Sequence, residues 1–239
     1  MSGTPPLLSV RDLRVAFGES QILHGVSFDV CAGGITALLG RNGAGKTTTL
    51  RGILGLDERS GSVVFAGDDL SRAATHAIVK RGIGYVPENR DVFGSLTVEE
   101  NLRIAERAGS ESRYAYVYDL FPELRERAAQ RAGTLSGGQQ QMVALARAFL
   151  CAENRLMLVD EPTKGLSPLM VKRVADALAA AARDITILLV EQNLSVANLL
   201  ATDAIVLDQG RVTYTGRGAD LMDDRELARR HLGIATAAH

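Results

Sequence analysis

One stretch of ten residues has the residue types and the spacing needed to bind phosphate. The sequence GRNGAGKTTT, residues 40–49, fits the pattern GxxxxGK[ST] between an apolar run and a helical pattern. Its glycines let the backbone wrap around a phosphate, so that N–H groups and a helix N-terminus point inward. Lys46 would neutralise the terminal phosphates, and the Thr47 hydroxyl would ligate Mg²⁺. The predicted phosphate-binding residues are Gly40, Arg41, Asn42, Gly43, Ala44, Gly45, Lys46, Thr47 and Thr48.

Two acidic residues, Asp160 and Glu161, follow a second apolar run, LMLV. A carboxylate at the end of a buried strand can hold Mg²⁺ directly or through water, so we assign Asp160 to the metal. Glu161 comes next, where the backbone turns at Pro162, and we interpret it as the residue that orients and polarises the attacking water. An apolar run followed by two acids is a weak signal alone, and the phosphate loop upstream is what favours this interpretation.

A second glycine-rich stretch, LSGGQ at residues 135–139, precedes a helix predicted over about residues 139–150. Phosphoryl transfer needs a further group on the γ-phosphate, such as an arginine finger. Backbone N–H groups at a helix N-terminus could form such an anion site. A flexible Gly-Gly turn is the alternative. The residues of the candidate site are Ser136, Gly137, Gly138 and Gln139.

A third apolar run ends in LLVEQN, residues 188–193, and places Gln192 after a predicted buried strand. A glutamine amide can donate a hydrogen bond to a phosphate oxygen, but it carries no charge and cannot shuttle a proton. Hydrolysis would therefore depend on Glu161. A site that hydrolyses its nucleotide and one that only binds it both stay open at this point.

The hydrophobic patterns predict the elements that position these residues. Alternating patterns over residues 8–30 and 61–67 predict antiparallel strands, whereas continuous apolar runs near 35–40, 156–160 and 185–190 predict parallel strands covered on both faces. Residues 205–214 predict two strands around a turn. Residues 88–139 have a helical pattern, with TVEE at 97–100 as a capping box. The fold class is therefore α/β.

The bulk composition excludes several other functions. A net charge of -1, 5% aromatic residues and no Trp disfavour nucleic acid as a partner. The two cysteines form no disulfide framework or zinc motif. No apolar run reaches the roughly 18 residues of a membrane span, so a role at a membrane would require docking on proteins that cross it.

The motifs GRNGAGKTT, LSGGQQQ and LMLVDEP, in this order, resemble an ABC-transporter ATP-binding cassette over about residues 8–233. LSGGQ discriminates best, because other P-loop proteins lack it. The resemblance implies one cassette, residues 1–239, with ATP and Mg²⁺ as cofactors. Its P-loop NTPase, RecA-like core would span about 1–87 and 155–239, with an antiparallel β subdomain and a helical subdomain inserted at about 88–154. It also implies a head-to-tail dimer with a second ATPase subunit, in which Ser136 and Gly138 act in trans.

The resemblance also assigns single positions. Phe17 matches the aromatic residue that stacks on adenine, although it could equally be a strand core residue. Glu88, in GYVPENR, replaces the usual Gln and joins Thr47 and Asp160 as a candidate metal ligand. Gln192 replaces the usual His at the γ-phosphate and joins Glu161 as a candidate catalytic residue. Pro168 stands where Asp is usual.

These departures form a set of their own. VPE, EPTKGLSP, LVEQN, LTVEENL and HLG (residues 231–233) resemble the ATPase subunit of branched-chain amino-acid uptake transporters. Similar cassettes serve urea or short-chain amide uptake and lipid export. The resemblance implies a peripheral subunit at the cytoplasmic face of the cell membrane, with two transmembrane permeases and, indirectly, an external substrate-binding protein. The solute, the pairing of cassettes and the turnover rate stay open, as does a nucleotide-binding regulatory module with little hydrolysis.

Overall fold

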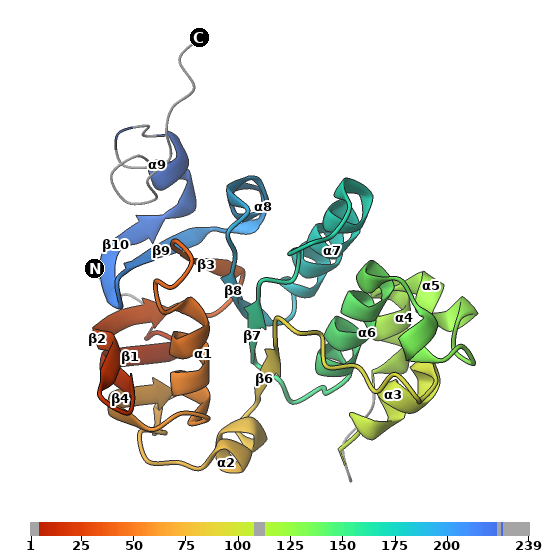
Figure 1. Cartoon of the computed structure of the whole chain (residues 1–239), viewed down its shortest axis with the longest axis horizontal. Helices are drawn as coiled ribbons and strands as arrows, with labels where there is room; N and C mark the ends of the chain where they lie inside the picture. Colours follow the sequence, from red (N-terminus) through yellow and green to blue (C-terminus); the bar gives the residue numbers. More distant parts are fainter. Residues whose placement is uncertain (1–4, 108–112, 224–225, 227–239) are drawn as a thin grey trace.

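The computed structural model of the chain describes residues 5–107, 113–223 and 226. The HLG stretch at residues 231–233 lies outside the described residues. Two sheets, a helix between them and a separate group of helices make up the architecture (Figure 1). Within the described part of the chain, no helix is long and apolar enough to cross a membrane.

The larger sheet has six strands in the order β10-β9-β3-β8-β7-β6. All neighbouring strands are parallel except β10, which pairs antiparallel with β9. The three continuous apolar runs therefore form buried parallel strands, as predicted. The strands are β3 (Ile35–Leu39), β6 (Ile83–Val86), β7 (Leu156–Asp160), β8 (Thr186–Val190), β9 (Asp203–Asp208) and β10 (Arg211–Arg217).

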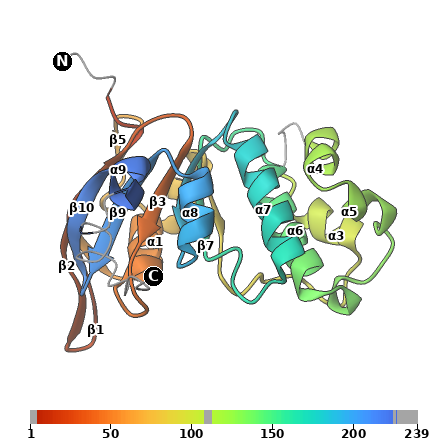
Figure 2. The same ribbon diagram turned by 90° about the horizontal axis from the view of Figure 1, so that it is seen from above.

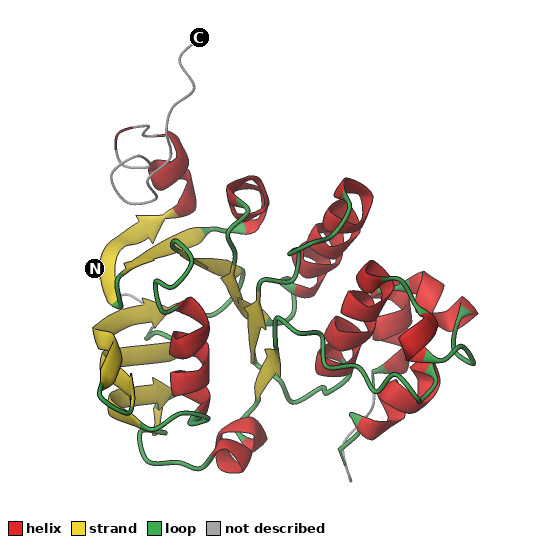
Figure 3. Cartoon of the chain, in the orientation of Figure 1, coloured by secondary structure: helices red, strands yellow, loops and turns green. Residues whose placement is uncertain are grey.

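The smaller sheet has four antiparallel strands in the order β2-β1-β4-β5. Its side chains alternate between buried and exposed, which is the pattern expected for a sheet with one face in solvent. Figure 3 shows the strands of both sheets in yellow. The strands are β1 (Leu8–Phe17), β2 (Ser20–Val30), β4 (Arg59–Phe65) and β5 (Asp68–Asp69).

Helix α1 (Lys46–Leu54) packs between the two sheets. Its buried residues Leu50, Ile53 and Leu54 share one hydrophobic cluster with side chains from both sheets. Along β7 the side chains alternate between faces: Leu158 points into this cluster and Val159 into the cluster on the opposite face. Burial on both faces fixes the register of the strand and hence the position of the residues that follow it.

The opposite face of the larger sheet is covered by α6 and α7, and α3, α4 and α5 continue outward from there (Figure 2). One hydrophobic cluster joins this face to the helical segment, so the segment is packed onto the sheet rather than tethered to it. The helices are α2 (Thr75–Lys80), α3 (Val98–Ile104), α4 (Tyr114–Leu120), α5 (Pro122–Glu126), α6 (Gly137–Phe149), α7 (Pro168–Ala181), α8 (Leu194–Leu200) and α9 (Gly218–Asp223), with a 3₁₀ turn at Ala132–Thr134.

The α/β class with its two sheets and its helices is confirmed, and so is the capping box between Thr97 and Glu100. The predicted start of α6 at about residue 139 is wrong by two residues. Ser136 is the N-cap, and its capping box with Gln139 allows the helix to begin at Gly137. The division into core and helical subdomain at residues 88 and 154 stays a prediction.

Candidate nucleotide-binding site

The phosphate loop and the polar candidate residues Glu88, Asp160, Glu161 and Gln192 lie at the carboxyl ends of four parallel strands. The phosphate loop follows β3, Glu88 follows β6, Asp160 ends β7 and Glu161 follows it, and Gln192 follows β8. The carboxyl ends of parallel strands meet at one edge of a sheet, where ligands of open α/β folds bind. Segments far apart in the sequence are thus brought to one place.

Two glycines of the phosphate loop hold conformations that a side chain would prevent. Gly40 and Gly45 have positive φ angles of 152° and 100°. A methyl group at Gly40 would clash with the carbonyl oxygen of Leu207, and one at Gly45 would lie 2.6 Å from Leu23 Cδ2. Glycine is therefore required at both positions by backbone geometry and by packing.

Lys46 begins α1 and is only 4% exposed. Its Nζ donates hydrogen bonds to the carbonyl oxygens of Gly40 (2.9 Å) and Arg41 (3.1 Å) and lies 3.6 Å from Glu161 Oε1. The ammonium group is thus held inside the curve of the loop, at the N-terminus of a helix, where a phosphate would be bound.

A pocket of about 340 Å³ joins the phosphate loop to the ends of the other strands. A smaller hollow of about 270 Å³ shares Asn42 and Gln192 with it and also contacts Gly40, Arg41 and Glu191. Most of the predicted site residues thus line these two neighbouring hollows. The residues around the larger pocket are Phe17, Ile22, Asn42, Gly43, Gly45, Lys46, Thr47, Thr48, Glu88, Glu161, Lys164 and Gln192.

Asp160 is fully buried and is not among the residues that line this pocket, although the adjacent Glu161 and Thr47 are. Burial raises the pKa of its carboxyl group to about 6, and the repulsion of Glu161 adds to the rise, while the Thr47 side chain lowers the pKa. Neither carboxylate oxygen has a partner within hydrogen-bond geometry among the described residues. A buried carboxylate without partners, beside a threonine hydroxyl, has the donor chemistry that Mg²⁺ prefers, so these residues fit the metal.

The described residues hold no cluster of three or more His, Cys, Asp and Glu side chains arranged for a metal ion. Mg²⁺ in nucleotide sites does not need such a cluster, because one or two carboxylates and the phosphates of the substrate supply its ligands. Glu88 lies on the wall of the same pocket as Thr47, but its Oε1 is 2.5 Å from Lys164 Nζ. The metal-binding role of Glu88 stays a prediction.

Glu161 has a left-handed backbone conformation, with φ of 44°, and its side chain is 7% exposed. Positive φ is uncommon for a residue other than glycine, and such strain is often found at functional sites. Its Oε1 accepts a hydrogen bond from Gln192 Nε2, and its Oε2 lies 3.4 Å from Lys164 Nζ. The carboxylate is therefore oriented at the pocket wall by groups on both of its oxygens.

Glu191 is a buried residue of the site whose role the sequence analysis missed. Its Oε1 accepts hydrogen bonds from the Thr163 hydroxyl (2.6 Å) and the Thr163 N–H (3.3 Å). Its Oε2 accepts from the N–H groups of Gln192 and Asn193, each at 3.1 Å. Burial raises the pKa of this carboxyl group, and these hydrogen bonds lower it. The carboxylate joins the turn that follows Glu161 to the turn that holds Gln192.

Phe17 ends β1 and is 52% exposed on the wall of the pocket. Because Phe17 is not buried in the core of the smaller sheet, the alternative that it is a core residue is disfavoured. An exposed aromatic face beside a phosphate loop can stack on a purine base.

The structure does not bring the LSGGQ segment to this pocket. Ser136, Gly137, Gly138 and Gln139 are absent from its lining and lie instead at the N-terminus of α6, where Ser136 and Gln139 cap the helix. The Arg90 side chain lies beside Gly137 and adds positive charge there. The predicted anion site is thus assembled separately from the phosphate loop of the same chain.

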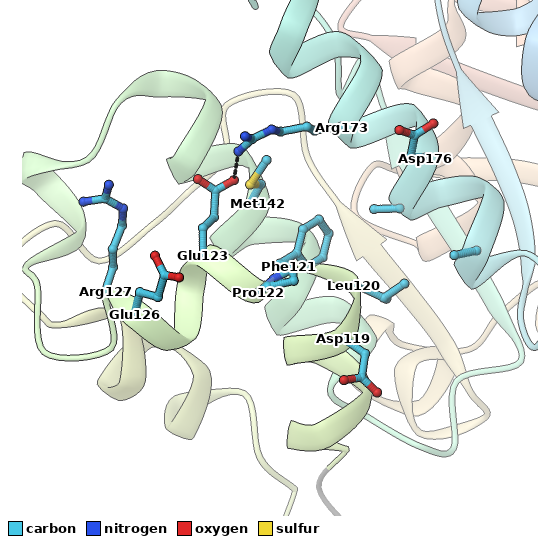
Figure 4. A pocket seen from close by; sticks show the side chains of 12 residues that line it. Asp119, Leu120, Phe121, Pro122, Glu123, Glu126, Arg127, Met142, Arg173 and Asp176 are labelled. Atoms are coloured by element: carbon cyan, nitrogen blue, oxygen red, sulfur yellow. Dashed lines mark hydrogen bonds and ion pairs between the residues drawn. The ribbon is translucent and has the colours of Figure 1, made fainter.

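Another hollow, of about 600 Å³, lies among α4, α5, α6 and α7, away from the phosphate loop (Figure 4). Arg173 on α7 reaches across it to Glu123 on α5, with 2.7 Å between Nη1 and Oε1. Both signs of charge line it, and none of the predicted site residues does. It marks the joint between the helical segment and the sheet.

Comparison with known proteins agrees with this geometry. The family model described as ABC transporter matches residues 23–164. The branched-chain amino acid transport ATP-binding proteins BraG of Pseudomonas aeruginosa and LivF of Archaeoglobus fulgidus are 40% and 39% identical to the chain. These matches cover 95% of the chain and 100% and 99% of the relatives.

The lipopolysaccharide export ATP-binding protein LptB of Escherichia coli is 32% identical, over 95% of this chain and 97% of LptB. A solved ATP-binding subunit of an ABC transporter matches with a TM-score of 0.78 and 32% identity, over 92% of this chain and 94% of that one. The chain therefore belongs to the ABC transporter ATP-binding family. It is an ATPase subunit of the kind that works with transmembrane permeases and hydrolyses ATP to power transport.

Proposed function

We propose that this ATPase subunit powers the uptake of branched-chain amino acids. The observation that carries the proposal is the 40% identity to BraG over the full length of that protein. The motif set GYVPENR, EPTKGLSP and LVEQN supports it, because it resembles this subfamily at positions where most cassettes differ. Two further permease subunits and an external binding protein complete the proposed transporter, with the cassette at the cytoplasmic face of the membrane.

The predicted residues of the site have separate roles in the proposed reaction. Phe17 stacks on the adenine base, while the N–H groups of the loop and Lys46 bind the phosphates of ATP. Thr47 and Asp160 would hold Mg²⁺, with Glu88 as a further candidate ligand, and the ion would neutralise charge on the β- and γ-phosphates. The assignment of these side chains to the metal rests on their chemistry.

Hydrolysis itself rests on Glu161 in this proposal. Its carboxylate accepts a proton from a water molecule as the water oxygen attacks the γ-phosphorus, and ADP leaves with the electron pair of the broken bond. Gln192 Nε2 donates to one oxygen of Glu161. In the proposal, the Gln192 amide would also donate to a γ-phosphate oxygen. Since Gln192 cannot titrate, it orients groups without exchanging a proton.

The second cassette and the permease bind at two other surfaces in the proposal. Ser136, Gly137, Gly138 and Gln139 would complete the ATP site of the second cassette in a head-to-tail dimer. Residues 88–102 and the nearby helical surface would dock on a permease. In that segment Phe93 is 45% exposed, and the Arg147 guanidinium lies 4.9 Å from its ring centroid. An exposed aromatic beside a cation is typical of a binding surface.

The proposal is tested by substituting the proposed base and measuring hydrolysis and uptake together. We expect Glu161→Gln to lower kcat for MgATP by roughly 10²–10⁴, the usual contribution of a general base. In cells lacking the native gene, the wild-type chain should restore uptake of labelled leucine and Glu161→Gln should not.

The two halves of the proposal can fail separately. Near-normal turnover by Glu161→Gln would show that Glu161 is not the base. Restored uptake of urea, or restored lipid export, in place of leucine uptake would assign the chain to a related transporter. LptB is the relative that motivates the export arm of the test.

A further inference from the structure

Lys164 is a cation on the pocket wall that the proposed reaction does not use. Its Nζ lies 2.5 Å from Glu88 Oε1 and 3.4 Å from Glu161 Oε2. Glu88 follows β6 and Glu161 follows β7, so one ammonium group connects two strand ends. Most of the Lys164 side chain is in solvent, whereas Glu161 is buried, so the cation reaches the proposed base from the open side of the pocket.

The two oxygens of Glu161 have different partners. Oε1 faces Gln192 and Lys46, and Lys46 must also serve the phosphates of ATP. Oε2 faces Lys164, which leaves this lysine as its charged partner among the described residues. Because a carboxylate is planar, contacts at both oxygens define the direction of its lone pairs.

The backbone beneath Lys164 is anchored. The Lys164 N–H donates to the Glu161 carbonyl oxygen at 3.2 Å, and the preceding Thr163 is held by the buried Glu191. The backbone of Lys164 is thus held beside the base. Its ammonium group can change position only by rotation of the lysine side chain. An anchored backbone next to the base suits a residue that positions another group.

Glu88, the other partner of Lys164, begins the segment 88–97, whose backbone is unusual. Arg90 and Asp91 both have positive φ, and Arg147 Nη1 donates to the Asp91 carbonyl oxygen at 2.6 Å. A shift of this segment would move Glu88 relative to the β7 strand end. The ion pair with Lys164 would carry that shift to Glu161.

We propose that Lys164 is a positioning residue for the hydrolytic step, whose ammonium group bridges Glu88 to Glu161 and makes the orientation of the base depend on the segment 88–97. The inference rests on the proposed role of Glu161 as the base. It supplies a physical link from the proposed permease-docking segment to hydrolysis through one side chain. A lysine that instead bound the phosphates of ATP would affect nucleotide affinity, which the test separates.

The test compares Lys164→Met with Lys164→Arg in the full chain. Methionine keeps the length and apolar stem of lysine without its charge, and arginine keeps the charge. We expect Lys164→Met to lower kcat for MgATP about tenfold, in the range of coupling between neighbouring residues, with KM and the Kd for a fluorescent ATP analogue changed by less than about twofold. Lys164→Arg should restore most of kcat.

Two further variants complete the design. Lys172→Met removes a surface lysine of α7 that pairs with Asp176 at 2.7 Å outside the pocket, and it should match the wild type. In a Glu88→Gln background, Lys164→Met should lower kcat by less than it does alone, because one end of the bridge is already missing. Thermal unfolding of each variant shows whether it is folded.

Wild-type kcat in folded Lys164→Met would overturn the inference, and so would a rise in Kd with kcat unchanged. Equal effects of Lys164→Met with and without Glu88 would also overturn it, because no bridge would exist. The proposed function is judged independently by Glu161→Gln. If Glu161→Gln loses turnover while Lys164→Met does not, the positioning role of Lys164 is wrong and the role of Glu161 as the base is retained.

Discussion

At the scale of single residues, Asp160 and Glu161 are adjacent carboxylates in opposite surroundings. Glu161 contacts Gln192, Lys46 and Lys164, whereas Asp160 is buried without a hydrogen-bond partner among the described residues. The pKa of Asp160 is raised to about 6, first by burial. Ionising this carboxyl group in the folded chain costs free energy, but the ionised group can bind a cation. Asp160 therefore lowers the stability of the fold in favour of ligand binding.

The raised pKa gives a stability prediction for Asp160→Asn. The folded-state pKa of about 6 lies above an unfolded value near 4, so the stability contribution of Asp160 is greatest below pH 4 and falls as pH rises toward 6. Above pH 7, in EDTA and without nucleotide, we expect Asp160→Asn to raise the free energy of unfolding by about 1–3 kcal/mol. Urea denaturation at pH 8 measures this.

The matched control is Asp208→Asn, at the exposed end of β9 in the same sheet, which should leave stability nearly unchanged. Asp160→Asn should also lose Mg²⁺-dependent hydrolysis, because an amide is a poorer ligand than a carboxylate. A variant less stable than the wild type at pH 8 would contradict the argument from burial.

At the scale of elements, the turns after β7 and β8 are joined by one buried carboxylate. Glu191 receives two hydrogen bonds from Thr163 and one each from the N–H groups of Gln192 and Asn193. The Asn193 side chain in turn caps α8 through the N–H groups of Ser195 and Val196. The turns that carry the residues around Glu161 are therefore held to each other by hydrogen bonds. Such contacts fix the geometry of a site.

Thr163→Val tests this connection between the turns. Valine keeps the shape of threonine but removes the hydroxyl that donates to Glu191, so we expect a loss of about 1.5–3 kcal/mol, the usual value of a hydrogen bond to a charged group. Chemical denaturation at pH 7 measures the loss, and Thr163→Ser, which keeps the hydroxyl, should recover most of it. Equal stability of the valine variant and the wild type would show that the bond contributes nothing.

At the scale of the whole molecule, the two glycine-rich motifs do not meet within one chain. The phosphate loop lines the pocket, and Ser136 lies exposed at the N-terminus of α6, outside it. A nucleotide could contact both motifs if the second came from another chain. This separation supports the proposed head-to-tail dimer, because the LSGGQ segment lies outside the pocket that the phosphate loop of its own chain lines.

Ser136→Arg tests dimer closure. In a Glu161→Gln background, which should retain ATP, we expect the wild-type motif to give a dimer in light scattering and Ser136→Arg to stay monomeric. The affinity of the monomer for a fluorescent ATP analogue should not change, because Ser136 does not line the pocket of its own chain.

Two controls separate closure from folding. Ser136→Asp keeps an N-cap but places negative charge against phosphate, so it should also block the dimer. Thr215→Arg, on the exposed side of β10, should not. Loss of nucleotide binding by monomeric Ser136→Arg would contradict the assignment in trans.

Local patterns in the sequence predicted many of the elements around the site and the types of residue in it. Continuous apolar runs predicted the parallel strands, and GRNGAGKT predicted a phosphate loop, because the period of burial and the need for glycine are local properties. The tertiary structure alone decided which polar groups meet. Lys164 reaches Glu88 across 76 positions, and Glu191 reaches Thr163 across 28. Such contacts depend on the order β3-β8-β7-β6, and strand order arises from packing of the whole chain, which no local pattern records.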